Sequence, residues 1–234
     1  MIAHRLLGAG HQTVVAELAP GQTLWCGPHR LLWATPNVTV RLRPPAPGPD
    51  GVDGVLDRAV ATAVAAGRRR LAGAPAGLPH LRAVGGSGLA ALAGPDGGEV
   101  RAVELAGRAW LVHWDGLVAA EVTVGLDGPA PDWPEAAGPP PQRLAGAGTL
   151  LLAGAGGLAE VDPAGFGGEV RVDADRLVAL QEGVRAAPTA GLTQALAVAL
   201  GGAPGRLVSL RGAGTVLLRV AARPRALQER RREA

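Results

Sequence analysis

The apolar residues of this chain alternate with other residues over short stretches, and glycine or Gly-Pro interrupts these stretches about every ten residues. Alternation with a period of two is typical of half-buried strands, whereas an amphipathic helix repeats every 3.6 residues. Valine and leucine cluster within the stretches, and the glycines mark turns between them. The pattern therefore predicts an all-β fold of short strands and hairpins.

The alternating pattern recurs in three gapless windows of 18 residues, 21–38, 107–124 and 167–184, at offsets of 86 and 60 residues. Each window opens with a glycine (Gly21, Gly107 and Gly167) and closes with a valine. Every copy also holds matched apolar positions: Leu24, Trp110 and Val170; Cys26, Val112 and Val172; Leu31, Leu117 and Leu177; Leu32, Val118 and Val178. Such self-similarity indicates a repeated structural unit. We predict a pseudo-threefold β-sandwich or double-stranded β-helix-like domain built from three repeated β-units.

A second pattern, Gly-x-Gly, ends 19 residues before the opening glycine of the second and third windows. It comprises Gly86 and Gly88, Gly146 and Gly148, and a last copy at Gly212 and Gly214. Within strands, such glycines indicate a positive φ or a close approach of another chain segment. No window follows the last copy, and no copy precedes the first window. We therefore expect the closing strand to complete the unit that the opening strand begins, with the termini side by side.

Two segments depart from the strand pattern. Residues 55–70 carry small and aliphatic residues on one helical face, with aspartates at the start and arginines at the end, as the helix dipole favours. Residues 192–200 form a shorter amphipathic stretch that two glycines end. We predict two short helical insertions in a single all-β domain, residues 1–222, followed by a frayed arginine-rich tail, residues 223–234.

Composition narrows the class of protein. The chain has 234 residues, of which 36 are glycine and 20 proline, and its formal net charge is only +3. All 23 basic residues are arginine, so the isoelectric point of about 10.7 reflects the high pKa of arginine more than a charged surface. A single cysteine excludes an intramolecular disulfide and favours a reducing compartment, so we expect a cytoplasmic protein. The apolar stretches fall short of the roughly 20 residues of a transmembrane helix.

The residues that usually carry catalysis do not form a recognisable set. The five histidines lack metal-binding spacings, and neither a nucleophile elbow nor a phosphate-binding loop occurs. Cys26 shares its position with two valines, which indicates a buried apolar residue. Asp173 and Asp175 fit turn capping, and Ser87 fits turn filling. We expect no enzyme activity, no metal and no cofactor.

The tryptophans are the most distinctive side chains, because the chain has five of them but one phenylalanine and no tyrosine. Trp110 occupies a core-facing position of its window. Trp25 lies between two core positions, so strand alternation turns it to the opposite face, and Trp33 follows the same logic. We interpret Trp25 and Trp33 as candidate interface residues that a partner subunit covers. The alternative is that a second layer of the same chain buries both.

Two long segments resemble a known family. The segment HQTVVAELAPGQTLWCGPHRLLWATPNV from His11 resembles the opening strand, glycine turn and second strand of the Altered Inheritance of Mitochondria family, number twenty-four. The segment GLTQALAVALGGAPGRLVSLRGAGTVLLRV from Gly191 is similar to its closing helix, glycine-rich turn and last strand pair. The resemblance implies an all-β fold related to the tryptophan RNA-binding attenuation protein. It also implies a link to mitochondrial inner-membrane organisation in some members, but no catalytic residues.

These observations favour a non-catalytic binding or scaffold protein that forms homo-oligomers or binds another protein. Peripheral association with a membrane stays open. The alternative is a nucleic-acid or small-ligand binding protein, by analogy with the RNA-binding relative, with arginines 68–70 and 230–232 as the phosphate contacts.

Overall fold

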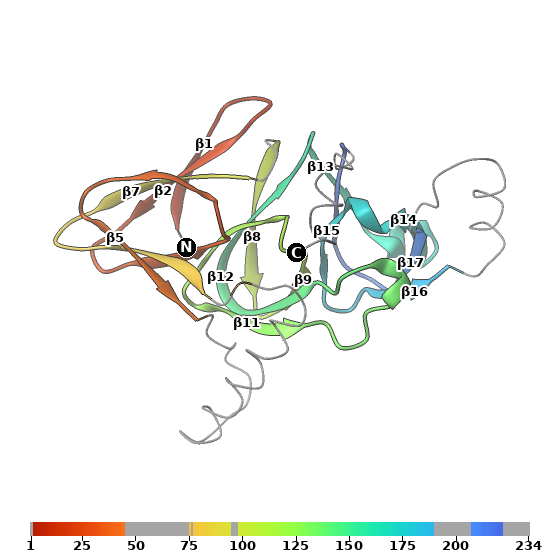
Figure 1. Cartoon of the computed structure of the whole chain (residues 1–234). Helices are drawn as coiled ribbons and strands as arrows, with labels where there is room; N and C mark the ends of the chain where they lie inside the picture. Colours follow the sequence, from red (N-terminus) through yellow and green to blue (C-terminus); the bar gives the residue numbers. More distant parts are fainter. Residues whose placement is uncertain (1, 45–74, 76, 95–97, 190–206, 222–234) are drawn as a thin grey trace, which may run out of the picture.

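A computed structural model describes residues 2–44, 75, 77–94, 98–189 and 207–221 (Figure 1). The regular elements of these ranges are strands and short 3-10 helices, so the predicted all-β fold is confirmed. The strands are β1 (Ala3–Leu7), β2 (Thr13–Leu18), β3 (Thr23–Cys26), β4 (Leu31–Ala34), β5 (Val38–Arg43), β6 (Leu78–Ala83), β7 (Gly88–Ala93), β8 (Glu99–Ala106), β9 (Trp110–Val112), β10 (Leu117–Glu121), β11 (Val124–Pro129), β12 (Gln142–Gly154), β13 (Leu158–Val161), β14 (Glu169–Asp173), β15 (Leu177–Gln181), β16 (Arg185–Pro188), β17 (Leu207–Arg211) and β18 (Val216–Arg219). The 3-10 helices are η1 (Glu135–Ala137), η2 (Pro163–Phe166) and η3 (Ala174–Arg176). The helical insertions predicted at 55–70 and 192–200 and the tail at 223–234 lie outside the described residues.

The same strand pairings occur in three successive stretches, which we call the first unit (β1–β7), the second unit (β8–β12) and the third unit (β13–β18). The first strands of the windows, β3, β9 and β14, pair with β6, β12 and β17, which in turn pair with β5, β11 and β16. The second strands, β4, β10 and β15, pair with β7, β12 and β18. The units follow one another along the molecule (Figure 1). The pseudo-threefold symmetry stays a prediction, because recurring pairings do not establish a rotation axis.

The last strands do not close the molecule in the way the sequence suggested. β17 pairs with β14 and β16, and β18 pairs with β13 and β15, all within the third unit. At the other end, β1 pairs with β2, and β2 pairs with β7. The expectation that the closing strand completes the opening unit is therefore wrong. The Gly-x-Gly pairs belong to the unit whose window precedes them, so each unit is complete.

Neighbouring units are joined by strands that contribute to two hydrophobic cores. The first core lies mainly among β2, β3, β6 and β7, the second among β9–β12, and the third among β14, β15, β17 and β18. Leu24 and Cys26 of β3 enter the first core, whereas Trp25 between them enters the second. β3 also pairs with β10, and β9 pairs with β15. Each junction is thus an antiparallel strand pair with a core on either side.

A β-bulge near the start of each second strand controls which core its side chains enter. The register shifts between Leu117 and Ala119 in β10, and between Leu177 and Ala179 in β15. Because a bulge adds one unpaired residue, two successive side chains turn to the same side. Val118 and Ala119 accordingly both lie in the first core, the core of the preceding unit. The corresponding pair of β15, residues 178 and 179, lies in the second core.

The second glycine of each Gly-x-Gly makes room for a side-chain hydrogen bond. Glu121 Oε2 accepts the backbone N–H of Thr149 at 2.7 Å, and Gln181 Oε1 accepts that of Thr215 at 2.9 Å. In the first unit Thr35 Oγ1 accepts the N–H of Leu89 at 3.0 Å. A Cβ at the preceding glycine would meet these acceptors, at 2.5 Å for Gly148, 3.1 Å for Gly214 and 3.2 Å for Gly88. The close approach expected of these glycines is confirmed.

The other structural glycines agree with the sequence interpretation with one exception. The glycines that open the windows have similar positive φ angles, +79° for Gly21 and Gly107 and +76° for Gly167. Gly146 and Gly212 also have positive φ, and a Cβ on either would lie within 2.4 Å of a carbonyl oxygen. Gly86 has neither property, so its assignment is wrong. The adjacent Gly85, with φ of +74°, makes this turn instead.

We predict that Gly148→Ala lowers the free energy of unfolding by about 2 kcal/mol, because φ of +144° suits only glycine and the new Cβ displaces Glu121 from its hydrogen bond. Urea unfolding followed by circular dichroism measures the change. Gly10→Ala is the matched control, since its Cβ meets nothing within 4 Å. Equal midpoints for the two variants would contradict this role of Gly148.

Candidate functional site

The single cysteine is a core residue. Cys26 is fully buried in the first core, which confirms the interpretation drawn from its two valine counterparts. Burial raises the pKa of its thiol to about 12, although the nearby Arg30 guanidinium opposes the shift. At neutral pH the group is a protonated thiol, which is neither a good nucleophile nor a good metal ligand.

Aspartate and histidine side chains of the windows lie in or beside turns. Asp173 Oδ1 accepts the backbone N–H of Asp175 at 3.1 Å and caps η3, so the predicted turn capping is confirmed. His29 lies in the turn after β3 with φ of +59°. Ser87, the middle residue of the first Gly-x-Gly, is exposed, and its carbonyl oxygen accepts a hydrogen bond from Asn37 Nδ2 at 2.9 Å. Within the described ranges, no group of three His, Cys, Asp or Glu side chains is arranged to hold a metal ion.

Arginine side chains bind the units to one another. Arg30 of the first unit donates to the carbonyl oxygens of Leu117 and Asp115 in the second, at 3.0 and 3.2 Å. Arg219 of the third unit forms a buried ion pair with Asp115 and also donates to Leu177 O at 3.3 Å. Arg143 joins Asp127 to Glu182 of the third unit, and the hydrogen bond to Glu182 is the main reason that its pKa is raised. These contacts give the arginines a structural role.

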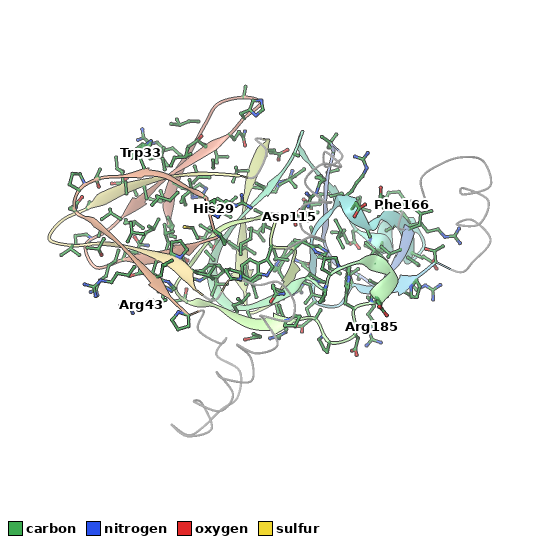
Figure 2. The ribbon with its side chains drawn as sticks, in the orientation of Figure 1. His29, Trp33, Arg43, Asp115, Phe166 and Arg185 are labelled. Carbon is green, nitrogen blue, oxygen red and sulfur yellow. The ribbon has the colours of Figure 1, made fainter. Side chains whose placement is uncertain are left out.

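The two candidate interface tryptophans have different environments. Trp25 does face away from Leu24 and Cys26, but the second unit covers it, and only 4% of the residue is exposed. Its indole N–H donates to Val124 O at 2.9 Å. The expectation that a partner subunit covers Trp25 is therefore wrong, because a second layer of the same chain buries it. Trp33 is 48% exposed and lies toward the opposite end of the molecule from Phe166 and Arg185 (Figure 2).

Trp33 and its neighbour Leu32 occupy the bulge of β4. The register shifts between Leu31 and Trp33, as it does in β10 and β15. The equivalent pairs of the other units are fully buried in the preceding unit's core, whereas Leu32 and Trp33 are 55% and 48% exposed. Among the described residues, no strand of another unit pairs with β4. Sequence reasoning missed Leu32, although its alignment with Val118 and Val178 was visible in the windows.

The edge of β4 differs from the other sheet edges of the described residues. Seven other strands in the described part of the chain pair with one strand only, and each contains a charged residue: β1, β5, β8, β11, β13, β14 and β16. Charged residues and proline on an edge strand prevent pairing with another molecule. β4, with the sequence LLWA, has neither, and among the described strands it pairs with β7 alone. Leu32, Trp33 and the backbone of β4 therefore form an apolar edge, which we call the β4 edge.

Comparison with known proteins identifies the family. A model of the family described as Mitochondrial biogenesis AIM24 matches residues 4–219. The chain belongs to this family. The resemblance recognised in the sequence is thus confirmed, whereas the relation to the tryptophan RNA-binding attenuation protein stays a prediction.

The fold also has a counterpart among solved structures. A Streptococcus pyogenes protein, whose crystal structure a structural genomics consortium determined, matches with a TM-score of 0.69 and 15% sequence identity over 100% of both chains. At this identity the match shows the fold alone. No curated protein matches the chain. In the described part of the structure, no helix is both long and apolar enough to cross a membrane.

Proposed function

We propose that this AIM24-family protein is a non-catalytic scaffold that acts through self-association and partner binding. The observation that supports this function best is the β4 edge, an apolar strand edge without charge or proline. Exposed aromatic and aliphatic residues on a pairing-competent edge are typical of an interaction surface.

The arrangement of the other polar groups agrees with this proposal. The buried Cys26 thiol is protonated, Asp173 caps a turn, and Arg30 and Arg219 link units to one another. Asp173, Arg30 and Arg219 are engaged in contacts that stabilise the fold, and the two arginines that meet at Asp115 are bound there to carbonyl oxygens and a carboxylate of the chain itself. A catalytic site needs several such groups directed toward one reacting atom.

We predict that the purified protein associates in a concentration-dependent way, because covering the β4 edge removes apolar surface from water. Sedimentation velocity and light scattering measure the mass over about a hundredfold range of concentration around the micromolar. A mass that rises toward a multiple of 23.5 kDa is the expected result. A mass of one chain at every concentration would contradict self-association.

One observation favours the alternative, a nucleic-acid binding protein. The described parts of the first unit hold five arginines and one glutamate, whereas residues 98–189 and 207–221 hold more acidic than basic residues. Arg41, Arg43 and Arg82 lie on one face of the β5–β6 pair, with His80 opposite Arg41. All three arginines are exposed. Such a strip can contact phosphates, although it lacks the aromatic side chains on which bases stack.

If this alternative holds, single-stranded RNA binds with an affinity that falls with salt at a logarithmic slope of about −2, as three phosphate contacts predict. Fluorescence anisotropy measures the slope for the wild type and for the triple variant Arg41→Ala, Arg43→Ala, Arg82→Ala. The triple variant Arg108→Ala, Arg171→Ala, Arg185→Ala is the control, since it removes three exposed arginines elsewhere. Equal binding by both variants would rule out the β5–β6 strip as the contact.

A further inference from the structure

The two ends of the row of units are closed differently. At the far end of the third unit, β14 presents Glu169, Arg171 and Asp173 along its edge, and Ser209 and Arg211 bind Glu169. Trp133 and Ala137, from the connection between β11 and β12, pack against the third core. The third unit thus has its own apolar cover and a charged outer edge. The first unit has neither at β4.

Arg171 disfavours the pairing of β14 with a further unit. The equivalent residues at the two internal junctions are Trp25 and Leu111, which pack into the second and third cores. The third unit has the exposed Arg171 at this place. A head-to-tail contact would direct this guanidinium toward the apolar face of the next copy's first unit, at a desolvation cost. The strand that best matches the β4 edge is therefore not β14.

The internal junctions show what a β4 edge can bind. β10 and β15, which correspond to β4, each pair antiparallel with a strand of another unit through this edge. At both junctions the bulge residues become fully buried. β4 repeats the bulge and carries larger apolar side chains, Leu32 and Trp33. The β4 edge thus has the same features as the edges of β10 and β15 that form the two internal junctions.

We propose that the β4 edge binds the β4 edge of a second copy of the chain. This inference rests on the proposed self-association. The two strands pair antiparallel across a two-fold axis near Leu32 and Trp33 and join two four-stranded sheets, of order β1-β2-β7-β4, into one continuous sheet. β4 has no charge that would oppose its own copy. Because the contact is isologous and β14 is capped, assembly stops at the dimer.

Leu32→Lys tests the proposal, because a lysine protects an edge strand from pairing and places two like charges beside the axis. Leu42→Lys is the matched control, since Leu42 of β5 is 76% exposed and lies on a different edge. We expect Leu32→Lys to weaken the dimer at least about tenfold in sedimentation equilibrium, which corresponds to about 1.4 kcal/mol, and Leu42→Lys to leave it unchanged. Circular dichroism verifies that both variants are folded.

A cross-linking measurement gives an independent readout. In Leu32→Cys the new thiols face each other across the axis, so mild oxidation links two copies, whereas Leu42→Cys stays unlinked. The native Cys26 is buried and does not interfere. A wild-type dimer that persists unchanged in Leu32→Lys, without cross-links in Leu32→Cys, overturns the β4 contact but leaves self-association standing. A wild-type protein that stays monomeric overturns both.

Discussion

The structure depends on strands that serve two cores at once. A strand covered on both faces needs apolar residues at successive positions, and β3, with Leu24, Trp25 and Cys26, shows this requirement directly. The bulges of β10 and β15 extend the same device, because two adjacent side chains enter the neighbouring core while the rest of the strand stays in its own. Each unit therefore completes the core of the unit before it.

This dependence makes the two ends of the row different from its middle. A unit without a predecessor has bulge residues with no core to enter, and a unit without a successor has an open face on its own core. At the end of the third unit, Trp133 and Ala137 cover the open face of the core, and the charged residues of β14 protect the sheet edge. At the end of the first unit, the bulge residues Leu32 and Trp33 stay exposed on an uncharged edge. Proteins with stacked units need polar caps for solubility, so this apolar end supports the proposed self-association.

The part of the fold that follows from local pattern was predictable. Alternation predicted the strands, and the gapless windows aligned Gly21, Gly107 and Gly167, which share nearly the same φ. The core position of Trp110 and the burial of Cys26 followed from their aliphatic counterparts. These features depend on the residues within one window, which the sequence shows directly.

The features that depend on strand order were not predictable in the same way. The expectation that the closing strand completes the opening unit was wrong, because the pattern within a strand does not reveal its partner, and β17 and β18 pair inside the third unit. Trp25 and Trp33 could not be distinguished, since alternation says that a side chain faces away from one core but not whether a second core lies there. Gly86 was misassigned because the turn of the first unit places its positive φ one residue earlier.

The proposed pairing of two copies through the β4 edge would shield the backbone of β4 from solvent. Hydrogen–deuterium exchange of the peptide spanning β4, measured over a range of protein concentrations, tests it most directly, because pairing protects backbone N–H groups that otherwise face water. If the β4 edges of two copies pair, exchange in β4 slows as the protein associates, while exchange at the charged edges of β5 and β14 is unchanged. Exchange in β4 that is independent of concentration while the protein associates, or protection that arises at β14 instead, would contradict it.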